Sequence, residues 1–276
     1  CVRRHLPMLG KAVVKIGDSV LSSDSVLTAE RLGEIDIISL ASKLGVDTDE
    51  CAKYLKVAVG DKISAGTLLG KASHFFGFVN SEVVSPIEGT IEFFNQANGN
   101  IGIRRPPTPV NVNAYTPGTV VEIEEGKSVT IESAGALIQG VVGVGGESNG
   151  ELVCLDDSAS RTIQSSEVLD TWSGKVVVGG RNWSVAALKK AQTIGVAGVV
   201  TGSIRFSELR EYIGCEPNIT ATGDEKINTI LVITEGFGTL DLSSRVLSLA
   251  KKLSGSVACI SGRTQVRAGA VRPELF

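Results

Sequence analysis

The chain has 276 residues, of which 42% are hydrophobic and 5% aromatic, and its formal net charge is -3. This length fits two or three domains of ordinary size, and the many short apolar stretches exclude a chain that is disordered throughout. The small net charge offers no general attraction to phosphate, so nucleic acid is disfavoured as a partner. The apolar stretches are too short to span a bilayer, so we expect no membrane insertion.

The cysteines and histidines give no sign of a metal site or a disulfide framework. The cysteines are Cys1, Cys51, Cys154, Cys215 and Cys259. They form no Cys-x-x-Cys pair, and the chain has only two histidines. Zinc sites and disulfide scaffolds both need closely spaced or evenly paired cysteines. We therefore expect reduced thiols, a cytoplasmic protein, no metal and no cofactor.

Two segments near the N-terminus repeat one pattern. VVKIGDSVLSSDSVL (13–27) and VAVGDKISAGTLLG (57–70) both place Gly-Asp between apolar residues. Glycine adopts positive φ and aspartate bonds the backbone that follows it, so this dipeptide favours a turn between short strands. The sequence predicts a duplicated strand-turn-strand unit. Between the copies, apolar residues at helical spacing predict a helical insert, in which Asp47 caps a short second helix that includes Cys51 and Tyr54.

The segment from Gly60 to Phe94, which begins within the second copy, resembles the biotinyl/lipoyl-like barrel-sandwich hybrid fold. The matching residues are Val59, Gly60, Asp61, Ile63, Gly66 and Leu69, then Ser85, Pro86, Gly89, Thr90 and Ile91. Among relatives, it is most similar to the versions in the C subunit of the Rnf electron-transfer complex and the A subunit of the sodium-pumping quinone reductase. Those versions use the fold without a carried group. The resemblance implies a fold and not, by itself, a function.

In that family a carrier lysine stands at the tip of a hairpin, where this chain has Phe75, Phe76, Gly77 and Phe78. Lys71 comes too early along the chain, so the resemblance implies that no group is carried covalently. The three phenylalanines have two interpretations. They pack as ordinary core against a neighbouring domain, or they form a partner-docking surface, because exposed aromatic clusters are costly unless covered.

The next segments predict short strands. SPIEGTIEFF contains an alternating strand from Thr90 to Phe94, and the proline-rich RRPPTPVNVNAYTPG favours an extended edge or a connection. GTVVEIEEGKSVTIES is similar to SH3-like barrels of KOW type, some of which bind RNA. Glu122, Glu124, Glu125 and Glu132 would repel phosphate, so a structural barrel is favoured.

From about residue 160, buried strands alternate with amphipathic helices. KVVVGG, VAGVVTGS and NTILVITEGFG are apolar throughout, and each is followed by a helical pattern. Strands that are apolar on both faces predict a parallel sheet covered by helices on both sides. We expect a barrel-sandwich hybrid-like domain with a helical insert (1–109), a small SH3/KOW-like barrel (110–158) and an α/β domain (159–276). The fold class is thus a β-rich N-terminal half joined to a C-terminal α/β domain.

Ligands of such sheets bind beyond the carboxyl ends of the strands. The small residues expected there are Gly179, Gly180 and Arg181 after the first strand, Gly202 and Ser203 after the second, and Glu235, Gly236 and Gly238 after the third. Glycines let the backbone approach an anion, which Arg181 or Arg205 would neutralise. The same glycines are equally usual in plain strand-to-helix turns, and neither G-x-G-x-x-G nor a P-loop is present. Glu235 is the one carboxylate placed for chemistry, or else it caps a helix.

The sequence therefore favours a non-catalytic assembly or adaptor subunit that docks onto a larger cytoplasmic complex of other protein subunits. The missing carrier lysine, the aromatic hairpin and the poor catalytic inventory all point in this direction. The alternative is an α/β domain that binds, or acts on, an anionic or phosphate-bearing small molecule.

Overall fold

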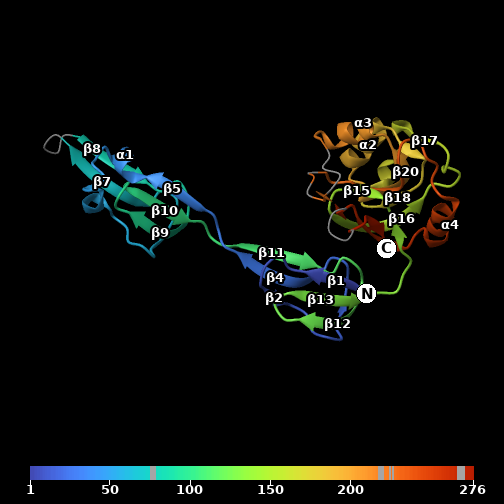
Figure 1. Ribbon diagram of the computed structural model, residues 1–276, viewed down its shortest axis with the longest axis horizontal. Helices are drawn as coiled ribbons and strands as arrows, with labels where there is room; N and C mark the ends of the chain where they lie inside the picture. Colours follow the sequence, from blue (N-terminus) through green and yellow to red (C-terminus); the bar gives the residue numbers. More distant parts are fainter. Residues whose placement is uncertain (75–78, 217–220, 224, 226, 266–270) are drawn as a thin grey trace. The chain divides into compact units, whose positions relative to one another are not determined.

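The computed structural model describes residues 1–74, 79–216, 221–223, 225, 227–265 and 271–276. The protein is rich in strands, which form several separate sheets (Figure 1). Two compact units result. One consists of Cys1–His5, Ala12–Val26 and Asn113–Phe276, and the other of Leu6–Lys11 and Leu27–Val112.

The second unit contains a four-stranded antiparallel sheet and a hairpin. The sheet order is β5 (Ile35–Ser39), β10 (Asn100–Arg104), β9 (Gly89–Asn95) and β6 (Lys62–Ile63), and the hairpin joins β7 (Leu68–His74) to β8 (Val79–Val84). The alternating strand expected at Thr90–Phe94 is confirmed as part of β9. Its Ile91 packs with Ile101, Ile103 and Leu69 in one buried core.

The helical insert of this unit is shorter than its sequence pattern predicts. Ile35–Ser39 is strand because it pairs with β10, so only α1 (Leu40–Leu44) is α-helical, and Gly45 ends it in a left-handed conformation. The second helix is the 3-10 helix η1 (Cys51–Tyr54), which begins after Glu50. The expectation that Asp47 caps it is wrong, because Asp47 lies in the preceding turn, where its carbonyl accepts from the Glu50 amide.

The strands that come before β5 and after β10 in the sequence form a second four-stranded sheet with the same strand order. The order is β1 (Val2–His5), β13 (Ser128–Glu132), β12 (Gly118–Glu124) and β3 (Ser19–Val20). A further sheet has the strand order β11 (Thr108–Asn113), β4 (Ser25–Arg31) and β2 (Lys11–Ala12). The proline-rich β11 is an edge strand, as expected. We call β1, β3, β4, β11, β12 and β13 the outer repeat, and β5 to β10 the inner repeat.

The two repeats share their turns, which confirms the predicted duplication. Gly17 and Gly60 have φ of 92° and 95°. Their amides donate to the carbonyls of Val120 and Ile91, both at 2.8 Å. The aspartate that follows each glycine accepts a 2.7 Å hydrogen bond from the backbone amide three residues earlier. Positive φ at these turns is the reason that glycine is needed there.

The repeats also share their strand register. In the outer repeat Val120 lies opposite Ile131, and a β-bulge then brings Glu122 opposite Thr130. In the inner repeat Ile91 lies opposite Ile103, and a bulge at the same place brings Phe93 opposite Gly102. Since β7 and β8 correspond to β4 and β11, the inner repeat is inserted where the outer repeat would have its hairpin turn.

The rest of the first unit is an α/β domain around an eight-stranded sheet. The order is β14 (Ile138–Gln139), β25 (Glu274–Leu275), β23 (Val257–Ser261), β16 (Glu147–Cys154), β18 (Val176–Val178), β20 (Gly198–Ile204), β22 (Ile230–Phe237) and β15 (Val142–Val144). β18, β20 and β22 are parallel, as the three apolar runs predict, and β16 adds a fourth parallel strand that was not predicted. The remaining pairings of the sheet are antiparallel.

One short segment, residues 138–144, forms the edge strands on both sides of this sheet. β14 pairs with β25, β15 pairs with β22, and only Gly140 and Val141 separate β14 from β15. The amide of Gly140 donates to Pro273 and that of Val141 to Ile233, both at 2.7 Å. A Cβ on Gly140 would lie 2.7 Å from Val232 and 2.8 Å from the Ile233 carbonyl, so glycine lets the segment run between the two edges. The sheet therefore closes on itself.

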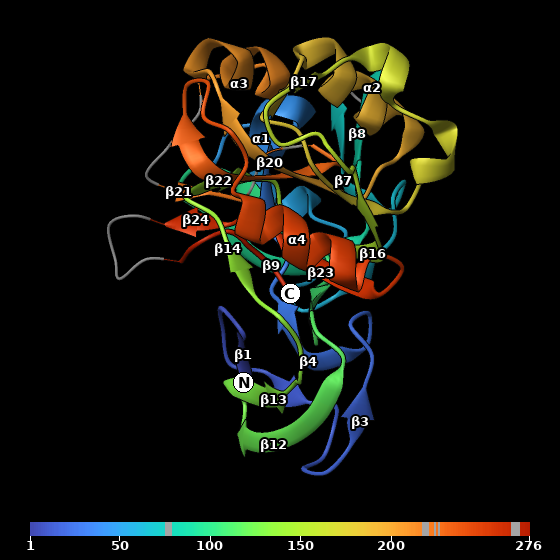
Figure 2. The ribbon, with the colours of Figure 1, turned by 90° about the vertical axis from the view of Figure 1, so that its right-hand side faces the viewer.

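Helices cover both faces of the closed sheet (Figure 2). One core contains residues of α2 (Val185–Ile194) and α3 (Phe206–Ile213). It also contains Val168, which follows the 3-10 helix η3 (Ser165–Glu167), and Trp172 of the 3-10 helix η4 (Asp170–Trp172), whose ring contacts that of Trp183. The other core contains Ala250 of α4 (Ser244–Leu253). The side chain of Ser184 caps α2 by accepting a hydrogen bond from the Ala187 amide. Short strand pairs complete the domain: β17 (Thr162–Ile163) with β19 (Asn182–Trp183), and β21 (Ala221–Thr222) with β24 (Thr264–Gln265).

The sequence pattern of residues 138–154 predicts further strands of the small barrel. In the structure these strands belong instead to the eight-stranded sheet. Val144 and Leu152 are buried in the two cores of the α/β domain. Short glycine-rich strands have the same local pattern in either setting, and only their distant pairing partners distinguish the two.

Candidate functional site

The lysine of the inner-repeat hairpin, Lys71, lies within strand β7. Lys71 lies opposite Glu82 in the β7–β8 ladder, and its Nζ is 2.7 Å from the Glu82 carboxylate. Both side chains remain about half exposed. The predicted docking residues Phe75, Phe76 and Phe78 lie outside the described residues. Their sequence, Phe-Phe-Gly-Phe, contains no lysine.

In the outer repeat, the corresponding strands β4 and β11 are joined by residues 32–107 instead of a turn. This connection holds the whole inner repeat, so a folded insertion, and not a turn, lies between these strands. Neither pair of strands is therefore joined by a short turn that contains a lysine.

The predicted ligand residues of the α/β domain come together at the carboxyl ends of β18, β20 and β22. The amide of Gly202 donates to the Gly180 carbonyl at 3.1 Å, and that of Ser203 to the Arg181 carbonyl at 2.7 Å. Gly238 donates to the Ile204 carbonyl at 2.9 Å, which joins the third loop to the second. The three strand ends are thus neighbours, as expected for adjacent parallel strands. Gly202 and Ser203 lie within β20, however, and Glu235 and Gly236 within β22, because these strands extend further than the apolar runs predict.

Three of these glycines are needed for packing. A Cβ on Gly179 would lie 2.6 Å from Leu155 Cβ, and one on Gly180 would lie 2.7 Å from Ile163 Cγ1. A Cβ on Gly202 would lie 2.7 Å from the Leu242 amide nitrogen. Gly236 and Gly238 differ, because open space lies where their Cβ atoms would be, at φ of 116° and 120°.

Glu235 is positioned by the start of α4. Its Oε1 accepts hydrogen bonds from the Ser243 amide and from Thr234 Oγ1, both at 3.2 Å. Ser243 is the N-cap of α4, so the carboxylate holds the entry to this helix. This geometry agrees with the helix-capping interpretation of Glu235.

Arg181 is the cation of this edge. Among the described residues its buried Nε has no hydrogen-bond partner, and Nη1 is 3.9 Å from Asp241, which itself accepts from Ser160 Oγ at 2.7 Å. An aromatic pair lies on the same side of the sheet. Phe206 and Phe237 are both 39% exposed, with ring centroids 5.8 Å apart and nearly perpendicular.

Sequence reasoning missed Asp241, Ser160 and the pairing of Phe206 with Phe237. A signal did exist for the phenylalanines, since each directly adjoins a residue already singled out, Arg205 or Gly236. Asp241 and Ser160 had none, because only the fold brings their loops together.

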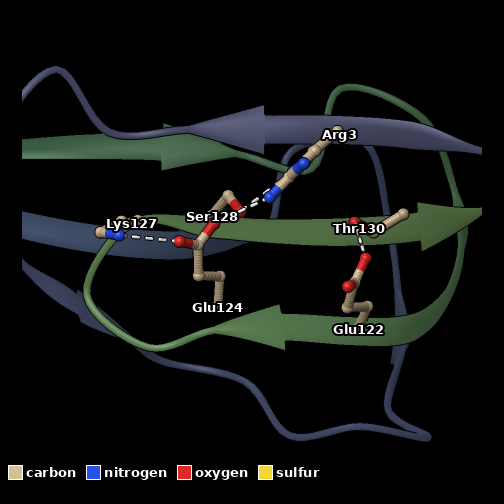
Figure 3. A network of polar contacts seen from close by, with 6 residues as sticks. All are labelled: Arg3, Glu122, Glu124, Lys127, Ser128 and Thr130. Carbon is tan, nitrogen blue, oxygen red and sulfur yellow. Dashed lines mark hydrogen bonds and ion pairs between the residues drawn. The ribbon is translucent and has the colours of Figure 1, made fainter.

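The acidic residues of the outer repeat are paired within the sheet (Figure 3). Glu124 bonds Arg3 and Lys127, both at 2.8 Å, and Thr130 donates to Glu122 at 3.1 Å. The Lys127 hydrogen bond holds the pKa of Glu124 below its usual range, with a further contribution from Arg3. Glu122 and Glu124 thus lie on a solvated polar face, which suits a structural sheet better than a phosphate-binding one.

The outer repeat also contacts the α/β domain within the first unit. Arg4 of β1 makes two hydrogen bonds to Glu147 of β16, at 2.6 and 3.0 Å, and its guanidinium lies 5.5 Å from the centre of the Tyr115 ring. Tyr115 is only 5% exposed, and its hydroxyl donates to the Cys259 carbonyl. Burial raises the pKa of Tyr115 and also that of the Cys259 thiol, the latter to about 11.

Comparisons with known proteins do not assign this chain to a family. No family model matches it, and no curated protein matches its sequence. Within the described ranges, no three histidine, cysteine or acidic side chains gather as a metal site. In the same part of the chain, no helix has the length and apolar character that crossing a membrane requires.

Proposed function

We propose that this protein is a non-catalytic assembly or adaptor subunit that docks onto a larger cytoplasmic complex. The observation that carries the proposal is that both repeats lack a lysine at the hairpin turn. In the inner repeat Lys71 is paired with Glu82 inside the ladder, and in the outer repeat a folded insertion replaces the turn. A carrier needs a free lysine at this place, so the fold is used for contact and not for carriage.

The proposal includes the nature of the repeats. Each is a barrel-sandwich hybrid of the biotinyl/lipoyl type, one inserted in the other, and the strands similar to SH3-like barrels belong to the outer copy. The shared sheet order, turn hydrogen bonds and β-bulge support this assignment. The C-terminal α/β domain then serves as a further binding module.

The test replaces the apolar side chains of the inner hairpin turn. The variant Phe75→Ser, Phe76→Ser, Phe78→Ser is compared with Ile37→Ser, which removes an exposed apolar side chain from β5. Native mass spectrometry of the complex from the original host is the readout. We expect the triple variant to lose its partner subunits and the control to keep them. Unchanged partner recovery and unchanged solubility of the triple variant would show that the hairpin is not a docking element.

A second function is favoured by one observation, the buried Nε of Arg181 without a partner among the described residues. An anionic or phosphate-bearing small molecule at the carboxyl ends of β18, β20 and β22 would satisfy this group. Isothermal titration with inorganic phosphate and with citrate tests the idea, with Arg181→Met as the variant and Arg205→Met as the exposed control. Binding that only Arg181→Met abolishes supports this function, and no binding to the unmodified protein counts against it.

A further inference from the structure

The two repeats carry equivalent surfaces next to their hairpin strands, and these surfaces can be compared residue by residue. Ala114 donates to the Asp24 carbonyl and Ser85 to the Thr67 carbonyl, both at 2.8 Å. Gly118 lies opposite Val20 just as Gly89 lies opposite Ile63. The stretch Tyr115–Pro117 of the outer repeat therefore corresponds to Pro86–Glu88 of the inner repeat.

In the outer repeat this surface is an interface. Tyr115 is buried against the Cys259 carbonyl of β23. Pro117 and Ala134 line an apolar pocket of about 260 Å³, whose other walls come from α4, β23 and β25. The next residue, Gly135, packs so closely on the Phe276 ring that a Cβ would lie 2.6 Å from it. The α/β domain thus docks on this surface with strand ends and apolar side chains.

In the inner repeat the equivalent surface is open. Pro86, Ile87, Glu88 and Pro106 line a groove of about 540 Å³, together with the exposed Ala65. Pro106 follows β10 and the outer-repeat Ala134 follows β13 at the corresponding place. No described residue of this unit covers the groove in the way that the α/β domain covers its counterpart.

The chemistry of the groove indicates what it would bind. Its lining is mixed: Ala65, Pro86, Ile87 and Pro106 are apolar, and Ser64, Glu88 and Arg105 are polar. Proline rings lose no side-chain rotamer freedom when they are covered. Arg105 at the rim is already paired with Asp36 at 2.6 Å, whereas Glu88 is exposed and makes no ion pair among the described residues. The uncompensated charge of the rim is therefore negative, and a cation on the partner would complement it.

We propose that the groove between Pro86 and Pro106 is a docking site for another protein, which places an apolar strand end in the groove and a lysine or arginine against Glu88. A second copy of this chain is a poorer fit, because the face of its α/β domain that matches such a surface already covers its own outer repeat. The inference rests on the proposed adaptor function and adds a contact surface that does not involve the hairpin turn.

The test has two stages. A photo-crosslinking amino acid replaces Ala65 in the groove or Ala97, an exposed alanine in the β9–β10 turn, and crosslinked products are identified in the original host. The identified partner is then purified, and its affinity is measured for the unmodified protein, for Glu88→Arg and for Asp49→Arg, a charge reversal at an exposed site in the loop before η1. Circular dichroism checks that each variant is folded, and Ala65→Arg gives a second way to fill the groove.

We expect crosslinking from Ala65 but not from Ala97, and at least tenfold weaker binding for Glu88→Arg with Asp49→Arg unchanged. The proposal is overturned if crosslinking is equal or absent at the two positions, or if the only crosslinked product is a second copy of this chain. It is also overturned if Glu88→Arg and Ala65→Arg leave the affinity for the partner unchanged. The hairpin triple variant separates the two proposals. A partner lost by that variant but kept by Glu88→Arg leaves the adaptor function standing and removes the groove.

Discussion

Replacing Arg4 by methionine is predicted to weaken the first unit far more than the same change at Arg3, its neighbour in β1. The two arginines make ion pairs of similar length, with Glu147 and Glu124 respectively. Their surroundings differ. The side chains of Arg4 and Glu147 are 13% and 20% exposed, whereas those of Arg3 and Glu124 are 49% and 43% exposed.

The magnitude follows from what Arg4→Met leaves behind. Glu147 loses two hydrogen bonds, the Asn113 carbonyl loses one at 2.8 Å, and the Tyr115 ring loses its cation. Removing one partner of a fully buried ion pair costs about 3–5 kcal/mol. Glu147 keeps some contact with water and with Arg263, 3.5 Å away, so we expect a loss of about 2–3 kcal/mol. The exposed Arg3 pair should contribute little that can be measured.

Urea unfolding followed by circular dichroism at neutral pH provides the assay. A double-mutant cycle with Glu147→Gln should recover most of the Arg4 loss as coupling between the two residues. Equal decreases in stability for Arg3→Met and Arg4→Met would refute the reasoning, because the contrast rests only on burial of the pair against the α/β domain.

Three further predictions concern the repeats, a buried thiol and the candidate site. Gly89→Ala and Gly118→Ala should each lower the free energy of unfolding in urea by about 1–3 kcal/mol, because the new Cβ would lie 2.3 and 2.2 Å, respectively, from a carbonyl oxygen on the adjacent strand. A loss of stability in one repeat only would contradict the equivalence of the two repeats. Burial raises the pKa of Cys259 from 9.0 to about 11, so the thiol of the unfolded chain ionises first and the free energy of unfolding should fall as the pH rises from 9 to 11. Cys259→Ala should reduce that fall, and the same pH profile in both proteins would show that this thiol does not contribute to it. Glu235→Ala should lower thermal stability by about 1 kcal/mol while Glu235→Gln, which keeps an oxygen for the Ser243 amide, should lose less; equal losses would show that the capping hydrogen bond is not what matters.

Much of the local structure could be predicted because it depends on local chemistry. The Gly-Asp turns require positive φ at Gly17 and Gly60, and the sequence shows the same dipeptide at both places. The apolar runs of β18, β20 and β22 predict a buried parallel sheet because each is covered on both faces. The start of α2 at Ser184 follows from its capping hydroxyl.

The nesting of one repeat in the other could not be predicted from local pattern. β1 pairs with β13, more than a hundred residues later, and nothing in the composition of Val2–His5 specifies that partner. The same holds for β14 and β15, whose glycine-rich pattern gives no sign that they join opposite edges of one sheet. Sheet pairing between distant strands is decided by the whole fold.

The candidate site was predicted in part for a similar reason. The loops after β18, β20 and β22 could be placed together, since the carboxyl ends of parallel strands share one edge. The Asp241 and Ser160 side chains near Arg181 come from two other loops, and their arrangement depends on how the chain returns past that edge. The packing roles of Gly179 and Gly202 depend on their distant neighbours Leu155 and Leu242, which the local sequence does not indicate.

The most direct test of the adaptor account is the intact mass of the chain and of its complex, measured by native mass spectrometry on protein purified gently from its own host. The account predicts an unmodified chain mass, together with a stable set of bound protein subunits. A chain whose mass is increased by a biotinyl or lipoyl group, mapped to Lys71 by peptide analysis, would contradict it, because that lysine would then be a carrier and not one half of an ion pair with Glu82.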